Sequence, residues 1–262
     1  MTRRMIVNTG IVALLLGFLI ACGSQSGAVQ QPSRTSERNQ GARMILVFSK
    51  TTGYRHASIK DGKEAIRKLA DQHSVHIDFT EDSSAFSDEN LARYKVVVFL
   101  STSGTILNAE QKAAFERYMH AGGGYAGIHS ATDTEYDWAW YGRLVGAFFK
   151  NHPHIVRASI NVEDQQHSST SMLSKKWEWT DEWYNFRTNP RNTVHVLLTV
   201  DESSYQGGEM GKDHPIAWYH EFEGGRAWYT ALGHRPESYN DPLFLAHLWG
   251  GISYAAGWSN EQ

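Results

Sequence analysis

Three short apolar runs, at 44–48, 96–100 and 124–128, constrain the fold of this chain more than any other feature. Each has the length of a strand and does not alternate between apolar and polar residues, which is typical of strands covered on both faces. Longer segments with helical character separate them. We therefore expect three adjacent parallel strands in the core of a mostly parallel α/β sheet, with helices on both faces.

The helices between these strands are predicted from their ends. Ser58 with Asp61 indicates a capping box at the start of the first helix, and Asn108 with Gln111 indicates one at the start of the second. The second helix should end at Gly122, because glycine readily takes the left-handed conformation that terminates helices. A further strand, with alternating apolar residues, is expected at 75–79.

The second half of the chain is less regular. Its expected elements are strands at 154–162, 194–200, 216–222 and 226–232, a hairpin turn at Gly224-Gly225, and an apolar final helix at 242–256. The aromatic and acidic segment 176–187 has no clear period. Since the sequence shows no internal repeat and no second boundary, residues 43–258 are expected to form one domain.

The first 42 residues are expected to lie outside this domain. Residues 1–21 have the basic start and short apolar stretch of a signal peptide, and the last of them, with Cys22, resemble the lipobox of a bacterial lipoprotein. Cys22, the only cysteine, would carry the lipid, and 22–42 would form a flexible tether. The predicted location is the bacterial cell envelope, with the membrane contacted through this anchor. The alternative is a plain signal peptide and an unmodified cysteine.

The charge balance argues against nucleic acid as a partner. The chain has 25 Lys and Arg against 28 Asp and Glu, a formal charge of −3, and no Lys/Arg-rich run. Proteins that bind nucleic acid usually carry a basic patch or stripe, which this sequence does not provide.

The segment GGGYAGIHSATDT, at 122–134, is the strongest candidate for a functional site. Small residues around His129 allow a sharp turn from strand to helix that projects one side chain above the sheet, as in a nucleophile elbow. A hydrolase with this architecture would carry Ser or Cys there, whereas this chain has a histidine. The alternative is that the glycines only close the preceding helix and His129 is a hydrogen-bonded core residue.

Other histidines also follow predicted strands. Parallel sheets bind ligands beyond the carboxyl ends of their strands, where His56 and His234 should lie with His129. Thirteen histidines raise the question of a metal, but there is no H-E-x-x-H motif and no Cys-based pattern, and the pair of His152 and His154 is a weak signal. No cofactor is therefore predicted, and zinc is kept as an alternative.

Four motifs carry a resemblance to a known family. They are GYRHAS at 53–58, GGGYAGIHSATDT at 122–134, TDEWYNF at 180–186 and GRAWYTALGH at 225–234. Together they resemble the ThuA-like, or trehalose-utilisation, family over essentially the whole domain. That family is similar in fold to class I glutamine amidotransferases, which implies a flavodoxin-like three-layer α/β sandwich.

The resemblance also implies a set of site residues. His129 matches the elbow position and His234 the late histidine of the amidotransferase triad, with Glu237 three residues further on. The family pattern adds to the pocket His56, Ser130, Asp133 and Glu182. Since residue 129 is not a cysteine, amide hydrolysis through a thioester is not available at that position.

The residue types favour acid–base chemistry on a saccharide. Histidines and carboxylates transfer protons near neutral pH, and flat aromatic faces such as those of Trp138, Trp183 and Tyr184 suit a sugar ring. We expect isomerisation or hydrolysis of a disaccharide or keto-sugar derivative, with His129 or Glu182 as the base and His234 as the polarising partner. The alternative is a non-catalytic lipoprotein that binds a saccharide at the cell surface.

Overall fold

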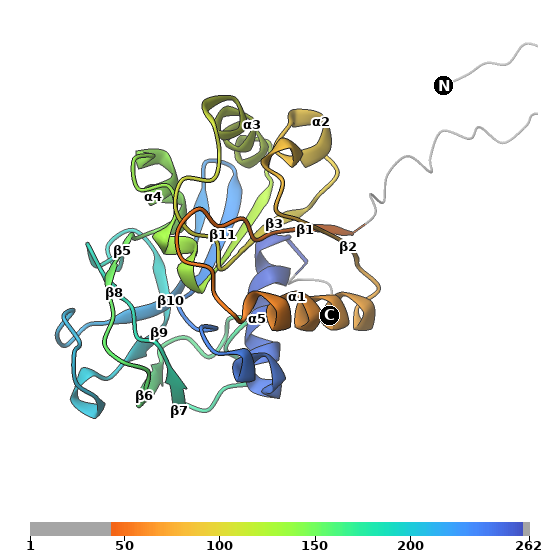
Figure 1. Cartoon of the computed structure of the whole chain (residues 1–262). Helices are drawn as coiled ribbons and strands as arrows, with labels where there is room; N and C mark the ends of the chain where they lie inside the picture. Colours follow the sequence, from red (N-terminus) through yellow and green to blue (C-terminus); the bar gives the residue numbers. More distant parts are fainter. Residues whose placement is uncertain (1–42, 259–262) are drawn as a thin grey trace, which may run out of the picture. The chain divides into compact units, whose positions relative to one another are not determined.

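The computed structural model describes residues 43–258, in which nine strands form one continuous sheet (Figure 1). The strand order is β2-β1-β3-β4-β11-β10-β9-β6-β7. The strands are β1 (Met44–Phe48), β2 (His76–Thr80), β3 (Val96–Leu100), β4 (Gly124–Ile128), β6 (Val156–Val162), β7 (Lys176–Asp181), β9 (His195–Val200), β10 (Pro215–Phe222) and β11 (Gly225–Thr230). Two short strands, β5 (Phe149–Asn151) and β8 (Asn185–Phe186), pair separately.

The first half of the sheet confirms the prediction from the apolar runs. β1, β3 and β4 are neighbours and run parallel, and their side chains from Ile45 onward are buried. β2 extends this parallel group on one side, and β11 extends it on the other by pairing with β4. The pairing of β11 with β4 places the segment after β11 beside the segment after β4.

The second half of the sheet is antiparallel. β10 pairs with both β11 and β9, and β6 pairs with both β9 and β7, in antiparallel register. Phe222 pairs directly with Gly225, so the hairpin turn consists of Glu223 and Gly224, with φ of +48° and +100°. Two central residues with positive φ are the requirement of a type I′ turn. The predicted turn at Gly224-Gly225 was therefore one residue too late.

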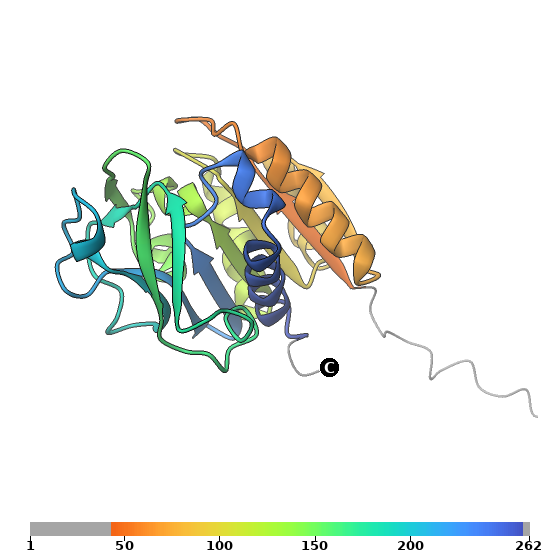
Figure 2. The same cartoon turned by 90° about the horizontal axis from the view of Figure 1, so that it is seen from below.

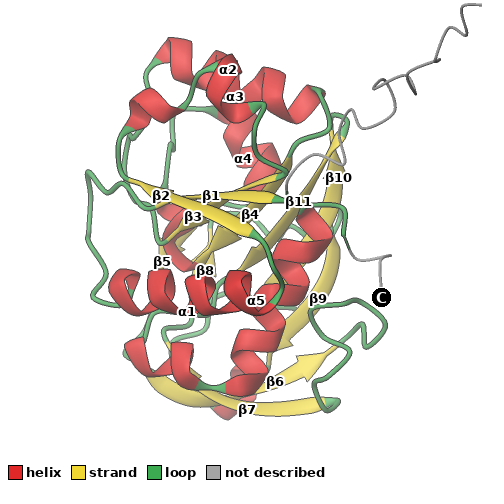
Figure 3. Ribbon diagram, turned by 90° about the vertical axis from the view of Figure 1, so that its right-hand side faces the viewer, coloured by secondary structure: helices red, strands yellow, loops and turns green. Residues whose placement is uncertain are grey.

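Helices cover both faces of the parallel half, which makes a mixed α/β fold in three layers (Figure 3). One face carries α1 (Ile59–Gln72) and α5 (Pro242–Ala255), which lie side by side (Figure 2). The other carries α2 (Asp88–Leu91), α3 (Ala109–His120) and α4 (Ala139–Val145). The layers pack closely, since a Cβ added at Gly124 would lie 2.1 Å from the carbonyl oxygen of Ala255 in α5.

The two predicted capping boxes have different outcomes. Asn108 and Gln111 form the reciprocal hydrogen bonds of a capping box at the start of α3, as predicted, and Gly122 follows this helix with φ +90°. Ser58 precedes α1 but makes no side-chain cap, and its buried hydroxyl has no partner among residues 43–258. The prediction for Ser58 was wrong because its backbone is already helical, whereas a capping side chain needs an extended residue.

The parallel strands end at one edge of the sheet. The segments that follow β1, β3, β4 and β11 therefore begin beside one another. Four short 3₁₀ helices lie in the described loops: η1 (Ser83–Ala85), η2 (His129–Asp133), η3 (Glu202–Ser204) and η4 (Pro236–Asn240). Between residues 43 and 258 no helix is both long enough and apolar enough to cross a membrane.

Candidate active site

The site is built around the turn at the end of β4. His129 has φ +51°, in the left-handed region that non-glycine residues rarely adopt, and η2 starts at this residue. The tight turn needs a small residue before it, because a Cβ at Gly127 would lie 2.6 Å from the hydroxyl oxygen of Tyr125. The hydroxyl of Tyr229 donates to the carbonyl of His129 at 2.8 Å and helps to hold the strained backbone.

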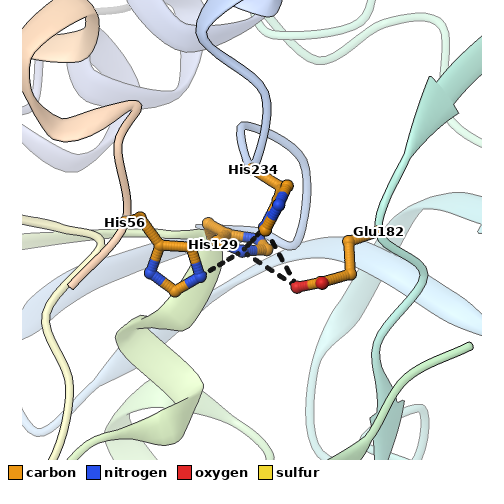
Figure 4. A group of neighbouring side chains, drawn as sticks. All are labelled: His56, His129, Glu182 and His234. Carbon is orange, nitrogen blue, oxygen red and sulfur yellow. Dashed lines mark hydrogen bonds and ion pairs between the residues drawn. The ribbon is translucent and has the colours of Figure 1, made fainter. Parts of the chain in front are cut away.

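The His129 side chain is fully buried and oriented by the neighbouring strand. Its Nδ1–H donates to the carbonyl of Ala231, just after β11, at 2.8 Å. Its Nε2 faces Nε2 of His56 at 3.1 Å and Nδ1 of His234 at 3.2 Å (Figure 4). The hydroxyl of Tyr184 lies 3.0 Å from the same nitrogen. The loops after β1, β4 and β11 thus meet at one ring nitrogen.

A carboxylate from the antiparallel half completes the group. Glu182 directly follows β7, and its Oε2 lies 3.1 Å from Nδ1 of His234 and 3.6 Å from Nε2 of His129 (Figure 4). Its other oxygen, Oε1, lies 3.1 Å from Nδ1 of His152. We call His56, His129, Glu182 and His234 the histidine–glutamate cluster. Each offers one ligand atom, and these four atoms all lie within 4.8 Å of one another, so the cluster could hold a metal ion.

Asp181 positions the loop that carries His234. Its buried carboxylate accepts from the backbone N–H of Gly233 at 2.9 Å and of His234 at 3.1 Å, and from the indole of Trp179 at 3.0 Å. Gly233 has φ +107°, which a residue with a Cβ would adopt only with strain. A strand end of the antiparallel half therefore sets the backbone of a loop that follows the parallel half.

Burial and close contact shift the pKa values in the cluster. Burial, together with the neighbouring imidazoles of His129 and His234, lowers the pKa of His56 to about 2. Burial alone would raise the pKa of Glu182, but hydrogen bonds with His129 and His234 outweigh it and hold that pKa well below its usual range. Burial would lower the pKa of His234, yet the contact with Glu182 raises it. At neutral pH the cluster therefore contains an ionised Glu182 and a neutral His56.

Two further expected site residues, Tyr184 and Ser130, contact the cluster. The ring of Tyr184 lies 4.4 Å from that of His129, centroid to centroid. Its hydroxyl contacts Nε2 of His129, the nitrogen that His56 and His234 also contact. Nε2–H of His214 donates to the carbonyl of Tyr184 at 2.8 Å, and this hydrogen bond helps to fix the backbone of Tyr184. The hydroxyl of Ser130 lies 3.3 Å from Nδ1 of His56.

Two expected carboxylates do not contact the histidines. Asp133 lies at the end of η2, where the hydroxyl of Tyr136 donates to it at 2.7 Å, and burial raises its pKa. Glu237 is exposed and lies 3.4 Å from Arg235. The triad pattern that paired His234 with Glu237 was therefore wrong for this chain, because the carboxylate in contact with His234 is Glu182, from a distant strand.

Two expected aromatic residues lie elsewhere. The indole N–H of Trp138 donates to Glu116 of α3, and its ring stacks on Trp140, so it belongs to the layer formed by α3 and α4. Trp183 is fully buried and donates to the carbonyl of Val156. The interpretation of Trp183 as a ligand-binding surface was wrong, because its ring is fully buried. Trp138 is only partly buried, so its role in binding a ligand stays a prediction.

The sequence interpretation missed His152 and Asp181. His152 was set aside with His154 as a weak HPH pair, but it contacts Glu182 while His154 is exposed. Asp181 was not singled out, although it directly precedes Glu182 in the motif TDEWYNF. The signal that could have drawn attention to Asp181 was its position next to Glu182, in an acidic pair among aromatic residues.

The cluster is open to solvent on one side. The exposed fraction of the side chain is 0% for His129 and 8% for Glu182, rises to 19% for His234, and reaches 40% for His152. A ligand would therefore approach past His152 and His234 and meet the carboxylate and the inward-facing ring nitrogens. Groups of this kind transfer protons and bind electron-poor centres.

Comparisons with known proteins agree on the family and the fold. The profile of the ThuA family, described as trehalose utilisation, matches residues 44–255. A ThuA-like protein from Bacteroides uniformis superposes with a TM-score of 0.71 at 22% identity, over 84% of this chain and 94% of that one. A ThuA-like protein from Parabacteroides merdae gives 0.68 at 18% identity, over 82% and 90%.

More distant similarity extends to a larger protein. A β-galactosidase from Bacillus circulans sp. alkalophilus superposes with a TM-score of 0.54 at 16% identity, over 83% of this chain but 31% of that enzyme. At these identities the structural matches show a shared fold alone. No functionally curated protein matches the chain at a significant level.

Proposed function

Because this chain belongs to the ThuA, or trehalose utilisation, family, we propose that it is an enzyme of carbohydrate metabolism that acts on a disaccharide or keto-sugar derivative. The family match suggests the metabolic area, and the substrate and reaction are our proposal. The preferred reaction is isomerisation or hydrolysis of a sugar that carries a carbonyl group.

The observation that carries this proposal is the convergence of four polar side chains from three separate segments on Nε2 of His129. A protein that only binds a neutral sugar does not need three imidazoles and a carboxylate in contact with one another. Buried ionisable groups with shifted pKa values are more typical of catalytic sites. The strained backbone of His129 favours the same conclusion, since such strain concentrates at functional positions.

The geometry supports acid–base chemistry next to a carbonyl group. This chemistry needs a base that removes a proton from carbon and a partner that stabilises the negative charge developing on oxygen. Glu182 is ionised and contacts both His129 and His234, which places it as the base, and His234, whose pKa is raised, can donate to the oxygen. His129 connects the two, while Ser130 and Tyr184 orient the imidazoles. Asp133 would act only on a part of the substrate that extends beyond the cluster.

We further propose that the fold is the flavodoxin-like sandwich of class I glutamine amidotransferases. The adjacent parallel strands β1, β3 and β4 and the sharp turn after β4 support this assignment. Glutaminase activity is not part of the proposal, because the elbow residue is His129 and cannot form a thioester.

We also propose that the protein is a lipoprotein of the bacterial cell envelope, anchored through Cys22. This cysteine and the preceding signal-like segment lie outside the described residues, so the proposal rests on their sequence. An anchored enzyme would meet saccharides at the membrane surface.

The experiment that tests the enzymatic role is product analysis after incubation with a panel of disaccharides and their 3-keto derivatives. We expect turnover of at least one keto derivative, and a loss of at least about 100-fold in the His129→Asn variant. Asparagine is chosen because it tolerates positive φ, so the turn should be retained. Saccharide binding without turnover, or an unchanged rate in the variant, would instead favour the non-catalytic binding protein.

A further inference from the structure

We propose that the histidine–glutamate cluster binds one divalent transition-metal ion, and that Zn²⁺ suits its donors best. The inference deepens the proposed function, on which it rests only for the role of the ion in turnover. Binding itself can be measured without any sugar.

The distances between the donor atoms match those around a tetrahedral ion. Ligand atoms about 2.1 Å from a tetrahedral centre lie about 3.4 Å from one another. The Nε2 of His129 is 3.1 Å from that of His56, 3.2 Å from Nδ1 of His234 and 3.6 Å from Oε2 of Glu182. Nδ1 of His234 is 3.1 Å from the same oxygen of Glu182. Since no pair of the four atoms is more than 4.8 Å apart, small side-chain rotations bring all of them onto one ion.

Hydrogen bonds alone leave this arrangement poorly satisfied. Nδ1 of His129 donates to the carbonyl of Ala231, so in the neutral ring Nε2 has one lone pair and no proton. One lone pair accepts one hydrogen bond well, yet ring nitrogens of both His56 and His234 lie within 3.2 Å of it. A cation between these nitrogens would engage the lone pair of each ring and the charge of Glu182 at once.

Groups that contact the cluster residues from outside resemble those that hold the ligands of a metal ion in place. Metal-binding histidines usually donate their other ring N–H to a carbonyl or another polar group, which fixes the tautomer. His129 does this with Ala231 at 2.8 Å, and Nδ1 of His56 lies 3.3 Å from the hydroxyl of Ser130. The second oxygen of Glu182 contacts His152 at 3.1 Å. Three of the four proposed ligands are therefore oriented by contacts with residues outside the cluster.

The donor types indicate which ion fits. Three imidazoles and one carboxylate suit Zn²⁺ and its neighbours in the first transition row, whereas Mg²⁺ and Ca²⁺ prefer a shell of oxygens. The donors include no thiolate, because residues 43–258 contain no cysteine.

The ion would leave room for a substrate oxygen on the solvent side. His234 is 19% exposed and His152 40%, whereas His129 is fully buried, so the coordination shell can expand only toward the first two residues. A carbonyl or hydroxyl oxygen bound there would be polarised by the ion. In the metal-bound protein Glu182 and His234 would serve as ligands and no longer as base and proton donor, and His152 and Tyr184 are the neighbouring groups that would take over proton transfer.

Metal binding by the full chain tests the inference. The protein, purified without a histidine tag and freed of metal by chelation, is titrated with ZnCl₂ by calorimetry and with CoCl₂ by visible absorption. We expect one ion per chain and the intense visible bands of low-symmetry Co²⁺. His234→Ala and Glu182→Gln should weaken Zn²⁺ binding by more than about 100-fold, because losing a group that only hydrogen-bonds to a ligand already costs about 10–100-fold. His154→Ala, which removes an exposed histidine outside the cluster, should bind as the unchanged protein does.

Two results would overturn the metal site. One is equal Zn²⁺ binding by all four proteins, which would place the ion elsewhere, and the other is no binding by the unchanged chain. Melting temperatures of the metal-free proteins show whether each variant is folded, and Glu182→Gln keeps the shape of the side chain in case His234→Ala is not. Failure of the metal site can be distinguished from failure of the proposed function. One ion bound without sugar turnover contradicts the function alone, whereas turnover that continues after complete chelation contradicts the role of the ion in turnover alone.

Discussion

Nε2 of His129 lies 3.1 Å from Nε2 of His56, although 73 residues separate the two in the chain. The contact exists because β1 and β4 flank β3 and run in the same direction. The segments that follow β1 and β4 therefore begin at the same edge of the sheet. β11 lies on the other side of β4 and brings His234 to the same point. The central position of β4 in this arrangement makes His129 the residue that the others contact.

The two candidate carboxylates can be separated by matched substitutions. We predict that Glu182→Gln reduces kcat by about 100-fold or more, because it removes the charge that contacts His129 and His234. Glu237→Gln should leave kcat and KM unchanged, since Glu237 is exposed and contacts Arg235. Steady-state kinetics on the substrate found in the panel check this. A larger loss in the Glu237 variant would restore the triad interpretation.

A second pair of variants tests the aromatic residues. Tyr184→Phe removes the hydroxyl that lies 3.0 Å from His129 and should lower kcat by about 10-fold, with little effect on the melting temperature. Trp138→Phe should leave kcat unchanged and lower the stability by about 1 kcal/mol, because Trp138 packs between α3 and α4. Kinetics together with thermal unfolding distinguish the two effects. Loss of activity in the Trp138 variant without loss of stability would place a substrate subsite there after all.

Buried histidines should make the stability depend on pH. Burial lowers the pKa values of His167, His220 and His247 to about 4. Between about pH 6.5 and 4 the unfolded chain therefore binds more protons at these residues than the folded chain does, so their contribution to the free energy of unfolding falls as the pH falls.

The size of this effect can be measured for one histidine. Between pH 7 and 5, we expect the metal-free His220→Leu variant to lose about 1–2 kcal/mol less stability than the unchanged protein, because one titrating group is gone. His154→Ala, at an exposed position, should keep the original slope. Urea unfolding at each pH gives the comparison, and equal slopes for all three proteins would contradict the low pKa of His220.

The lipid anchor can be tested in the cell. We predict that Cys22→Ser moves the protein from the membrane fraction to the soluble envelope fraction, without changing the melting temperature of the purified domain. Cell fractionation and mass spectrometry of the N-terminal peptide provide the measurement. An unmodified Cys22 in protein taken from the membrane fraction would disprove this anchor.

Local patterns in the sequence were enough to predict the parallel half of the sheet. The runs at 44–48, 96–100 and 124–128 are apolar throughout because both of their faces are covered, and that property is visible without knowing the neighbours. The same holds for the turn at His129, whose small neighbours are required by its own backbone. His56, His129 and His234 could be expected at one edge because each follows a parallel strand.

The tertiary structure decided how the other residues join the site, and Glu182 could be expected among them only from the family resemblance. Glu182 and Asp181 reach it because the antiparallel strands bring the end of β7 toward the loop after β11, and nothing local to either segment specifies that approach. Glu237 is closer to His234 in sequence but faces solvent, and Trp138 is drawn into the helical layer by its neighbours. Strand formation depends on the side chains of the strand itself, whereas the composition of a site depends on which strands become neighbours.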